Sequence, residues 1–372
     1  MTKYRFDEIA INSTQKKKPT EEDKVYYIGL EHIDPGCFDV VRWGSDIAPT
    51  GDKLLMQKGD VLFGKRRAYQ RKVAIAPFDG IFSAHGMVLR PNLKVIDANY
   101  FPFFISSDKF MDVAIRISVG GLSPTINWKD LAKQEFELPS LQEQKVLADK
   151  LWAAYRLKQA YKKLLAATDE MVKSQFIEMH YNTHNKQTLE AVCTIMSKGI
   201  TPKYVESSSI LVINQACIHW DGQRLENIKY HNEEISVRKR ILESGDVLLN
   251  ATGNGTLGRC CVFNCPSDNN TYINDGHVIA LSTDRAVILP EVLNAHLSLN
   301  DTQAEIYRQY VTGSTNQVDI VFSDIKKMKV PVPSMDEQIW FVEVLKQADK
   351  SKFELKQCIE NIDKVIKSLI NG

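Results

Sequence analysis

Apolar residues recur at spacings of three and four along two long stretches, one in the middle of the chain and one at its end. This spacing predicts amphipathic helices over 141–180 and 335–372. One lysine interrupts each apolar seam, and the two lysines stand 194 positions apart (352 − 158). The seam residues are Leu151, Ala154, Lys158, Tyr161, Leu165 and Val172 in the first helix, and Leu345, Ala348, Lys352, Leu355, Ile359, Ile362, Ile366 and Leu369 in the second.

Both predicted helices begin in the same way. LPSLQEQ (138–144) precedes the first helix, and VPSMDEQ (332–338) precedes the second. In each copy a proline ends the preceding strand, a serine (Ser140 or Ser334) can cap the helix, and a glutamate three positions later completes a capping box. The chain is therefore predicted to be two copies of one design.

The remainder of each half mixes short strands with one helical pattern. In the first half we expect strands over 25–34, 61–63, 71–80 and 83–91 and a helix over 100–119. The second half repeats this order over 210–222, 244–258, 275–283 and 291–310. The sequence thus predicts an α+β protein with two tandem mixed α/β domains, residues 1–140 and 181–334, joined by the helices 141–180 and 335–372.

An exposed apolar stripe along a helix of this length needs a partner. We expect the two long helices to pair as an antiparallel coiled coil, giving a pseudo-twofold molecule with its globular units at opposite ends. A lysine at the same seam position of each helix would fix the register of the pair. The alternative is that each helix packs only on its own domain.

Composition narrows the class of protein without identifying it. The net charge of +1 means that nucleic-acid binding has to be argued from local clusters. An odd count of 7 cysteines without a regular framework favours free thiols in a reducing compartment. The first residues lack the apolar segment of a signal peptide, and no apolar run is long enough to span a bilayer, so we expect a cytoplasmic protein without a membrane partner.

Several motifs resemble catalytic sites but fail on context. Residues 253–258 spell G-x-G-x-x-G, yet a β-prone stretch follows where a dinucleotide site needs a helix. Residues 59–65 spell G-x-x-x-x-G-K, but Arg66 stands where a phosphate-binding loop needs Ser or Thr. No second Cys or His pair at metal spacing accompanies Cys260, Cys261 and Cys265. We therefore predict no catalytic residue, metal or cofactor in this chain.

Other side chains of the sequence are suited to binding nucleic acid. The stretch 64–72 follows a strand and holds five cations, one aromatic residue and one Gln, side chains that can contact phosphates and bases. A solvated basic loop is the alternative. The second half offers short polar side chains in the equivalent place, so the frame repeats while the loops differ. The candidate DNA-binding residues are Lys65, Arg66, Arg67, Tyr69, Gln70, Arg71, Lys72, Ser123, Thr125 and Asn127, and in the second half Asn250, Thr252, Asn254, Thr256, Arg259, Ser314, Thr315, Asn316 and Gln317.

Four features together carry a family resemblance: GDVLFGKRRAYQRKVAIAPFDG (59–80), GDVLLNATGNGTLG (245–258), TGSTNQV (312–318) and the paired LPSLQEQ and VPSMDEQ. Over essentially its whole length the chain resembles the specificity subunits of type I restriction–modification enzymes. It departs from the family pattern at Ala68, where proline is usual. The resemblance implies that 1–140 and 181–334 are target recognition domains, each reading one half of a split DNA sequence. The long helices would be a spacer between them.

The resemblance also implies partners. These are double-stranded DNA, two modification subunits that methylate adenine N6 with S-adenosylmethionine, and restriction subunits that use ATP and Mg²⁺ to translocate and cut DNA. The chain itself would be non-catalytic. Two other classes remain open: a scaffold protein without catalysis, and a divergent single-chain methyltransferase or nuclease.

Overall fold

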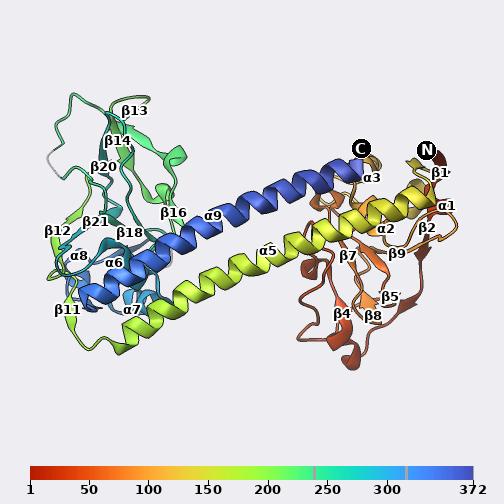
Figure 1. The fold of residues 1–372 in the computed structure, drawn as a ribbon, viewed down its shortest axis with the longest axis horizontal. Coiled ribbons are helices and arrows are strands. Elements are labelled where there is room, and N and C mark those ends of the chain that lie inside the picture. Colours follow the sequence, from red (N-terminus) through yellow and green to blue (C-terminus); the bar gives the residue numbers. More distant parts are fainter. Residues whose placement is uncertain (238–239, 315–316, 372) are drawn as a thin grey trace. The chain divides into compact units, whose positions relative to one another are not determined.

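The computed structural model describes residues 1–237, 240–314 and 317–371 (Figure 1). The chain divides into two compact units. Unit 1 comprises Met1–Leu164 together with Glu354–Gly372, and unit 2 comprises Leu165–Phe353. Each unit contains part of both long helices, α5 (Leu141–Asn182) and α9 (Met335–Asn371). These helices begin where the sequence predicts them, and they link two α/β domains as expected.

Unit 1 is built on two four-stranded sheets and one two-stranded ribbon. The first sheet has the order β2-β9-β6-β7 and is antiparallel throughout. The second has the order β3-β5-β8-β4, and only its β4–β8 pair is parallel. Strands β1 and β10 form the ribbon. The elements are β1 (Thr2–Arg5), α1 (Phe6–Ile9), β2 (Ala10–Ser13), β3 (Lys16–Lys17), β4 (Tyr27–Ile28), β5 (Lys53–Met56), β6 (Val61–Phe63), β7 (Val73–Ile75), β8 (Gly80–Phe82), β9 (Met87–Pro91), α2 (Phe101–Ser106), α3 (Asp108–Arg116), α4 (Trp128–Leu131) and β10 (Glu135–Leu138).

Unit 2 repeats the first sheet and the ribbon. Its sheet β12-β21-β18-β19 and its ribbon β11–β24 have the same pairing as their counterparts in unit 1. The elements are β11 (Lys186–Thr188), β12 (Cys193–Lys198), β13 (Tyr204–Val205), β14 (Ile210–Ile213), β15 (Ile218–His219), β16 (Gly222–Gln223), β17 (Lys229–His231), β18 (Val247–Asn250), β19 (Cys260–Val262), β20 (Thr271–Asn274), β21 (Val278–Thr283), α6 (Pro290–Ser298), α7 (Asn300–Gln309), β22 (Val311–Ser314), β23 (Gln317–Ile320), α8 (Phe322–Ile325) and β24 (Lys329–Pro331).

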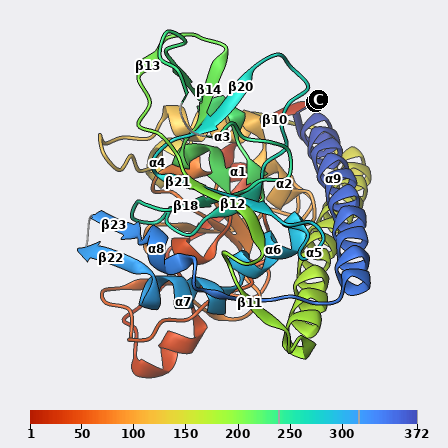
Figure 2. The same cartoon turned by 90° about the vertical axis from the view of Figure 1, so that its left-hand side faces the viewer.

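The second four-stranded sheet differs between the units. In unit 1, β8 lies between β5 and β4, whereas in unit 2, β14 lies between β17 and β20. Unit 2 also has a hairpin, β22–β23, which lies beside α7 and α8 (Figure 2). The two units are therefore most alike in their first sheets, which pack with the first turns of the long helices, and less alike elsewhere.

The start of each long helix is held by a buried glutamine. Ser140 and Ser334 form capping boxes with Glu143 and Glu337, as predicted. The next residue, Gln144 or Gln338, is fully buried. Gln144 Nε2 donates to the carbonyls of Val95 and Pro139 (3.1 and 2.9 Å), and its Oε1 accepts from the N–H of Asp97 (2.8 Å). In unit 2, Gln338 Nε2 donates to the carbonyls of Val287 and Pro333 (2.9 and 3.0 Å), and its Oε1 accepts from the N–H of Leu289 (2.8 Å).

These amides explain the end of the repeated motif. A buried amide with every hydrogen bond made orients three segments at once: the strand end, the helix start and the segment before α2 or α6. A serine–glutamate box alone could be satisfied by any well-capped helix. The glutamine adds a specific attachment of the helix to its own domain.

Within each unit the two long helices run antiparallel. In unit 1, Lys158 Nζ contacts the carboxylate of Asp363, and in unit 2, Lys352 Nζ lies 3.2 Å from Asp169. These are the same pair repeated, because 352 − 158 and 363 − 169 both equal 194. All of the predicted seam residues are buried or half-buried. Ion pairs of this kind contribute at most about 1 kcal/mol each, so they fix the register of the pair more than they stabilise it.

Three local predictions are wrong. The stretch 25–34 contains only the short strand β4, between two 3₁₀ helices, Glu21–Tyr26 and Leu30–His32. The helix predicted over 100–119 is two helices, because the Ser107 hydroxyl accepts from the N–H of Phe110 (3.1 Å) and caps a second one. A break at the equivalent place separates α6 from α7 in unit 2, where Leu299 stands at the N-cap and makes no side-chain cap.

We predict that Gln144→Leu destabilises unit 1. The shorter apolar side chain would leave two partly buried carbonyls and one N–H without partners, at a cost of about 2–3 kcal/mol in the free energy of unfolding. Gln338→Leu should do the same in unit 2. Denaturant unfolding of the chain measures both, with the exposed neighbour Gln142→Leu as the matched control. Equal stabilities for Gln144→Leu and Gln142→Leu would contradict this role.

Candidate nucleic-acid interface

The basic loop of unit 1 connects β6 to β7. Its ends are closed by the N–H of Gly64 donating to the carbonyl of Lys72 (2.9 Å). Between them lies a 3₁₀ turn, Ala68–Gln70, flanked by Arg67 and Arg71 with φ values of 55° and 53°. Left-handed backbone at a residue other than glycine costs roughly 1 kcal/mol or more and persists only where surrounding contacts hold it. The loop is therefore held in a definite shape.

The contacts that hold the loop use some of its cations. Arg71 pairs with the carboxylate of Asp108 on α3, and Lys72 Nζ donates to the carbonyl of Leu30 (2.6 Å). Arg67 donates through Nε and Nη2 to the hydroxyl of Ser123 (3.2 and 3.1 Å). Arg71 and Lys72 are thus anchors, which sequence reasoning did not separate from the remaining candidates.

The other candidates in unit 1 lie on the basic loop and on the segment around Thr125 that bridges to it. Its backbone forms a β-bridge with Thr125, and Nη1 lies 3.4 Å from Nε2 of His85. Lys65 is half-buried, and its carbonyl accepts from the N–H of Ile126 (3.0 Å). Tyr69 is 53% exposed, so its ring is accessible. Gln70 is half-buried, and Asn127 stands exposed at the start of α4.

Three further basic residues, Lys16, Lys53 and His85, belong to the surface around the basic loop and are not among the candidates predicted from the sequence. Burial, reinforced by nearby Lys16, lowers the pKa of Lys65. Burial, then Arg66, Lys65 and Lys53, lowers the pKa of His85. These effects show that cations from β3, β5 and the basic loop share one region. The sequence signal was the lysine run at 16–18, whose position beside the loop depends on sheet pairing that spacing alone does not reveal.

The glycine-rich loop of unit 2 connects β18 to β19 and is mostly self-contained. Asn250 is fully buried, and its Nδ2 donates to the carbonyl of Gln215 (3.1 Å). Thr256 Oγ1 bonds to Gln215 Oε1 (3.1 Å), and Arg259 Nη2 donates to the carbonyl of Gly255 (2.9 Å). These three candidates therefore shape the loop. Gly253 has a φ of 97°, and a Cβ there would lie 2.4 Å from Thr256 Oγ1, so this turn requires glycine.

Two candidates of this loop are accessible. Asn254 is exposed, and Thr252 is half-buried. Thr252 Oγ1 lies 2.9 Å from Nδ1 of His277, and its backbone forms a β-bridge with Asp319. Asp319 is in turn bound by Lys198 (2.8 Å). Ser314 and Gln317 end β22 and begin β23, and Thr315 and Asn316 lie outside the described residues.

Aligning the strand before each loop by residue number shows which positions of the two loops are equivalent. β6 begins at Val61 and β18 at Val247, so position 66 corresponds to 252 (offset 186). The bridge partner 125 corresponds to 319 (offset 194). At these two places unit 1 has Arg66 and Thr125, whereas unit 2 has Thr252 and Asp319. One frame thus presents different hydrogen-bonding chemistry in each unit.

Asp108 connects the basic loop to the end of α9 within unit 1. Besides Arg71, its carboxylate accepts from Asn371 Nδ2 (3.1 Å) and lies 3.3 Å from Lys367 Nζ. Its N–H donates to Asn371 Oδ1 (2.9 Å). The hydrogen bond from Arg71 is the main cause that lowers the pKa of Asp108. The loop conformation is therefore tied to the long helix.

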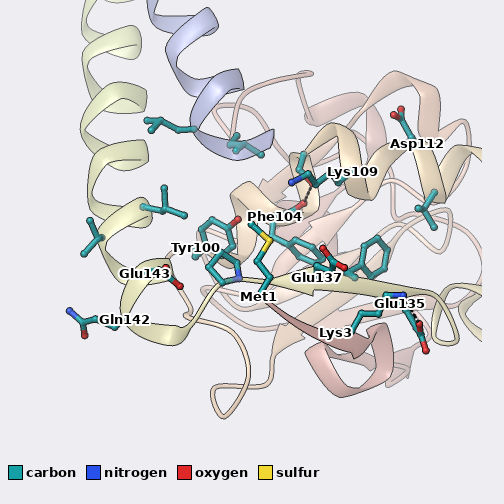
Figure 3. A pocket seen from close by; sticks show the side chains of 18 residues that line it. Met1, Lys3, Tyr100, Phe104, Lys109, Asp112, Glu135, Glu137, Gln142 and Glu143 are labelled. Carbon is teal, nitrogen blue, oxygen red and sulfur yellow. Dashed lines mark hydrogen bonds and ion pairs between the residues drawn. The ribbon is translucent and has the colours of Figure 1, made fainter. Parts of the chain in front are cut away.

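A cavity of about 840 Å³ lies elsewhere in unit 1, where β1, β10, α3 and the ends of the long helices meet (Figure 3). Its lining is largely apolar and includes Phe104, Leu147 and Ile370. The equivalent positions in unit 2 are His296, Phe341 and Phe176 (offsets 192, 194 and −194). There the ring centroids of Phe176 and Phe341 lie 5.0 Å apart, and His296 stacks on His180 with ring centroids 5.1 Å apart.

The cysteines, possible metal-ligand groups and long helices of the described residues were also located. All seven cysteines are free thiols, and of the three near 260 only Cys265 is exposed. Across the described residues, no group of three or more His, Cys, Asp or Glu side chains is placed to hold a metal ion. Within residues 1–237, 240–314 and 317–371, no helix is both long and apolar enough to cross a membrane.

Comparison with known proteins gives consistent matches. The family model for the type I restriction modification DNA specificity domain matches residues 3–166. The specificity subunits of the type I restriction enzymes StySPI of Salmonella potsdam and EcoKI of Escherichia coli K12 are each 23% identical over 94% of this chain, and the alignments cover 81% and 82% of those proteins. The EcoDI specificity subunit of Escherichia coli is 28% identical over 142 residues, 38% of this chain and 31% of its own length.

Solved structures share the fold. A chain from a structural study of complex assembly and conformational transition in the type I R-M system superimposes with a TM-score of 0.62 at 16% identity, covering 99% of this chain and 96% of that one. The S subunit of a type I restriction–modification system from M. genitalium superimposes with a TM-score of 0.57 at 14% identity, covering 99% and 94%.

We predict that Asp108→Asn weakens the Arg71 anchor. The pair is partly exposed, so a coupling of about 1 kcal/mol is expected in a double-mutant cycle of Asp108→Asn and Arg71→Ala, measured by unfolding of the chain. Because the folded-state pKa of Asp108 lies below its ordinary value of 3.8, its contribution is present above that pH and is lost as pH falls through the lowered pKa.

The matched control for this cycle is Asp112→Asn, an exposed carboxylate on the same helix. It should show no coupling to Arg71→Ala. Strictly additive effects of Asp108→Asn and Arg71→Ala would contradict the anchor.

Proposed function

We propose, starting from the fact that this chain belongs to the type I restriction–modification DNA specificity subunits, that each of its units reads one half of a two-part DNA target. The observation that carries this proposal is the repeated frame with unlike side chains. Arg66 and Thr125 in unit 1 stand where unit 2 has Thr252 and Asp319. An arginine donates two parallel hydrogen bonds suited to guanine, whereas a threonine and an aspartate present acceptors and a short donor. The two units would then prefer different bases.

In this proposal the non-catalytic chain supplies position, and other subunits supply chemistry. Modification subunits would methylate adenine N6 from S-adenosylmethionine, and restriction subunits would use ATP and Mg²⁺. Residues 1–140 and 181–334 would be the target recognition domains. The paired helices would set the distance between half-sites, which makes the second binding event intramolecular.

Exposed apolar positions on the long helices support docking of two equivalent modification subunits. Met171 and Val365, which are 194 positions apart, are 46% and 52% exposed. Leu164 is 52% exposed, and Cys358, again 194 positions later, is also exposed. Apolar side chains repeated on the outer faces of both helices are typical of an interface that is used twice.

We predict that Arg67→Ala weakens recognition of half-site one only. Loss of its contact to Ser123 and of one cation should reduce affinity about tenfold, within the range of a single specific contact. The measurement is binding of the chain, assembled with its cognate modification subunit, to duplexes altered in one half-site at a time. Lys94→Ala removes an exposed cation from the same unit away from the loop and should leave binding unchanged.

Replacing residues 181–334 with the corresponding domain of another specificity subunit gives an independent check. The methylated sequence should change in one half and keep the other half and the gap. A changed gap with both halves retained would contradict the division between reading units and spacing helices.

A further inference from the structure

An exposed histidine occupies the same place in both units. His85 precedes β9 and His277 precedes β21, and the offset of 192 between them is also that between Ser83 and Asp275 two residues earlier. Each histidine is joined to its loop through the backbone. The carbonyl of His85 accepts from the N–H of Arg66 (3.1 Å), and that of His277 accepts from the N–H of Ala251 (2.8 Å).

Each imidazole also contacts the side chain at the loop position that differs between the units. Nε2 of His85 lies 3.4 Å from Nη1 of Arg66, and Nδ1 of His277 lies 2.9 Å from Oγ1 of Thr252. A guanidinium can only donate, so Nε2 of His85 accepts, and in the neutral ring the proton is on Nδ1. Both histidines are exposed, and one nitrogen of each ring contacts the loop, which leaves the second nitrogen for a ligand.

The neighbours of the two histidines are different while the histidines are the same. Arg66, whose backbone bridges to Thr125, contacts one ring, and Thr252, whose backbone bridges to Asp319, contacts the other. If the two units read different base sequences, the side chains that differ between the units are suited to contact the bases, because the bases differ between the half-sites. A side chain that is identical suits what the half-sites share, and any two duplex segments share the sugar–phosphate backbone.

The charge around His85 fits a phosphate. Arg66, Lys65 and Lys53 all act on its ring, Glu31 opposes them with a smaller effect, and Lys16 lies near Lys65. A surface on which cations outnumber carboxylates attracts an anion, and a ring N–H can then complete its hydrogen bonding.

We propose, on the basis of the proposed function, that His85 and His277 each donate a ring N–H to a backbone phosphate of their half-site. They would thereby position the reading loop on the duplex without choosing its bases. They act as positioning residues, and the choice of base belongs to the residues beside them.

The experiment compares His85→Ala, His277→Ala and Arg66→Ala in the chain assembled with its cognate modification subunit. Binding is measured to the cognate duplex and to duplexes altered in half-site one or two. Each histidine variant should lose affinity roughly tenfold for every duplex, as expected for one hydrogen bond to a charged group, and the ratio between cognate and altered duplexes should stay the same. Arg66→Ala should change that ratio for half-site one.

A neutral methylphosphonate placed at successive backbone positions separates phosphate contact from loss of folding. With the unaltered chain, one position in each half-site should weaken binding, and His85→Ala should abolish the effect of the position in half-site one only. His85→Gln, which keeps a donor, should recover part of the affinity. A destabilised loop would weaken binding while leaving the methylphosphonate effect in place, and that result would overturn the inference.

Two outcomes distinguish the inference from the function on which it rests. If the unaltered complex discriminates both half-sites and His85→Ala changes either the base preference or nothing, only the inference is contradicted. If the unaltered complex shows no preference for a two-part sequence, the proposed function fails and the inference fails with it.

Discussion

The structure depends on the buried amides of Gln144 and Gln338. Each makes three hydrogen bonds that attach the first turn of a long helix to the strand before it and to the segment that leads into α2 or α6. A helix fixed at its first turn projects in one direction, and the ion pairs Lys158–Asp363 and Lys352–Asp169 then fix its register against the other long helix within each unit.

On this frame the units differ where contact with bases is expected. The loops after β6 and β18 leave the same sheet at the same place, yet one is rich in cations and the other in glycine and short polar side chains. The second sheets also differ in strand order. The proposed function requires this arrangement, because a frame that changed with the loops would lose the spacing, and loops that did not change would read the same half-site twice.

Much of the frame could be predicted from the sequence because its signals are local. Capping boxes at Ser140 and Ser334, the Val61–Phe63 strand and the seam around Lys158 and Lys352 all follow from spacing along the chain. Ser107 splits one predicted helix because its hydroxyl caps a second helix. The apolar pattern around it is weak, so the break could not be predicted from the sequence.

The candidate site was less predictable because it depends on strand pairing. Arg71 and Lys72 resemble their neighbours in sequence, but their carboxylate and carbonyl partners lie 37 and 42 residues away. His85 and His277 carry no motif, and their equivalence appears only once β9 and β21 are placed beside β6 and β18. The amide of Asn250 likewise looks available in sequence and is fully buried in the fold.

The central claim is that one frame, used twice, presents two different readers. The most direct measurement is sequencing of methylated adenines in DNA exposed to this chain together with its cognate modification subunit. The account predicts a motif of two unlike short sequences separated by a gap of constant length. A single uninterrupted motif, or two halves at variable separation, would contradict it.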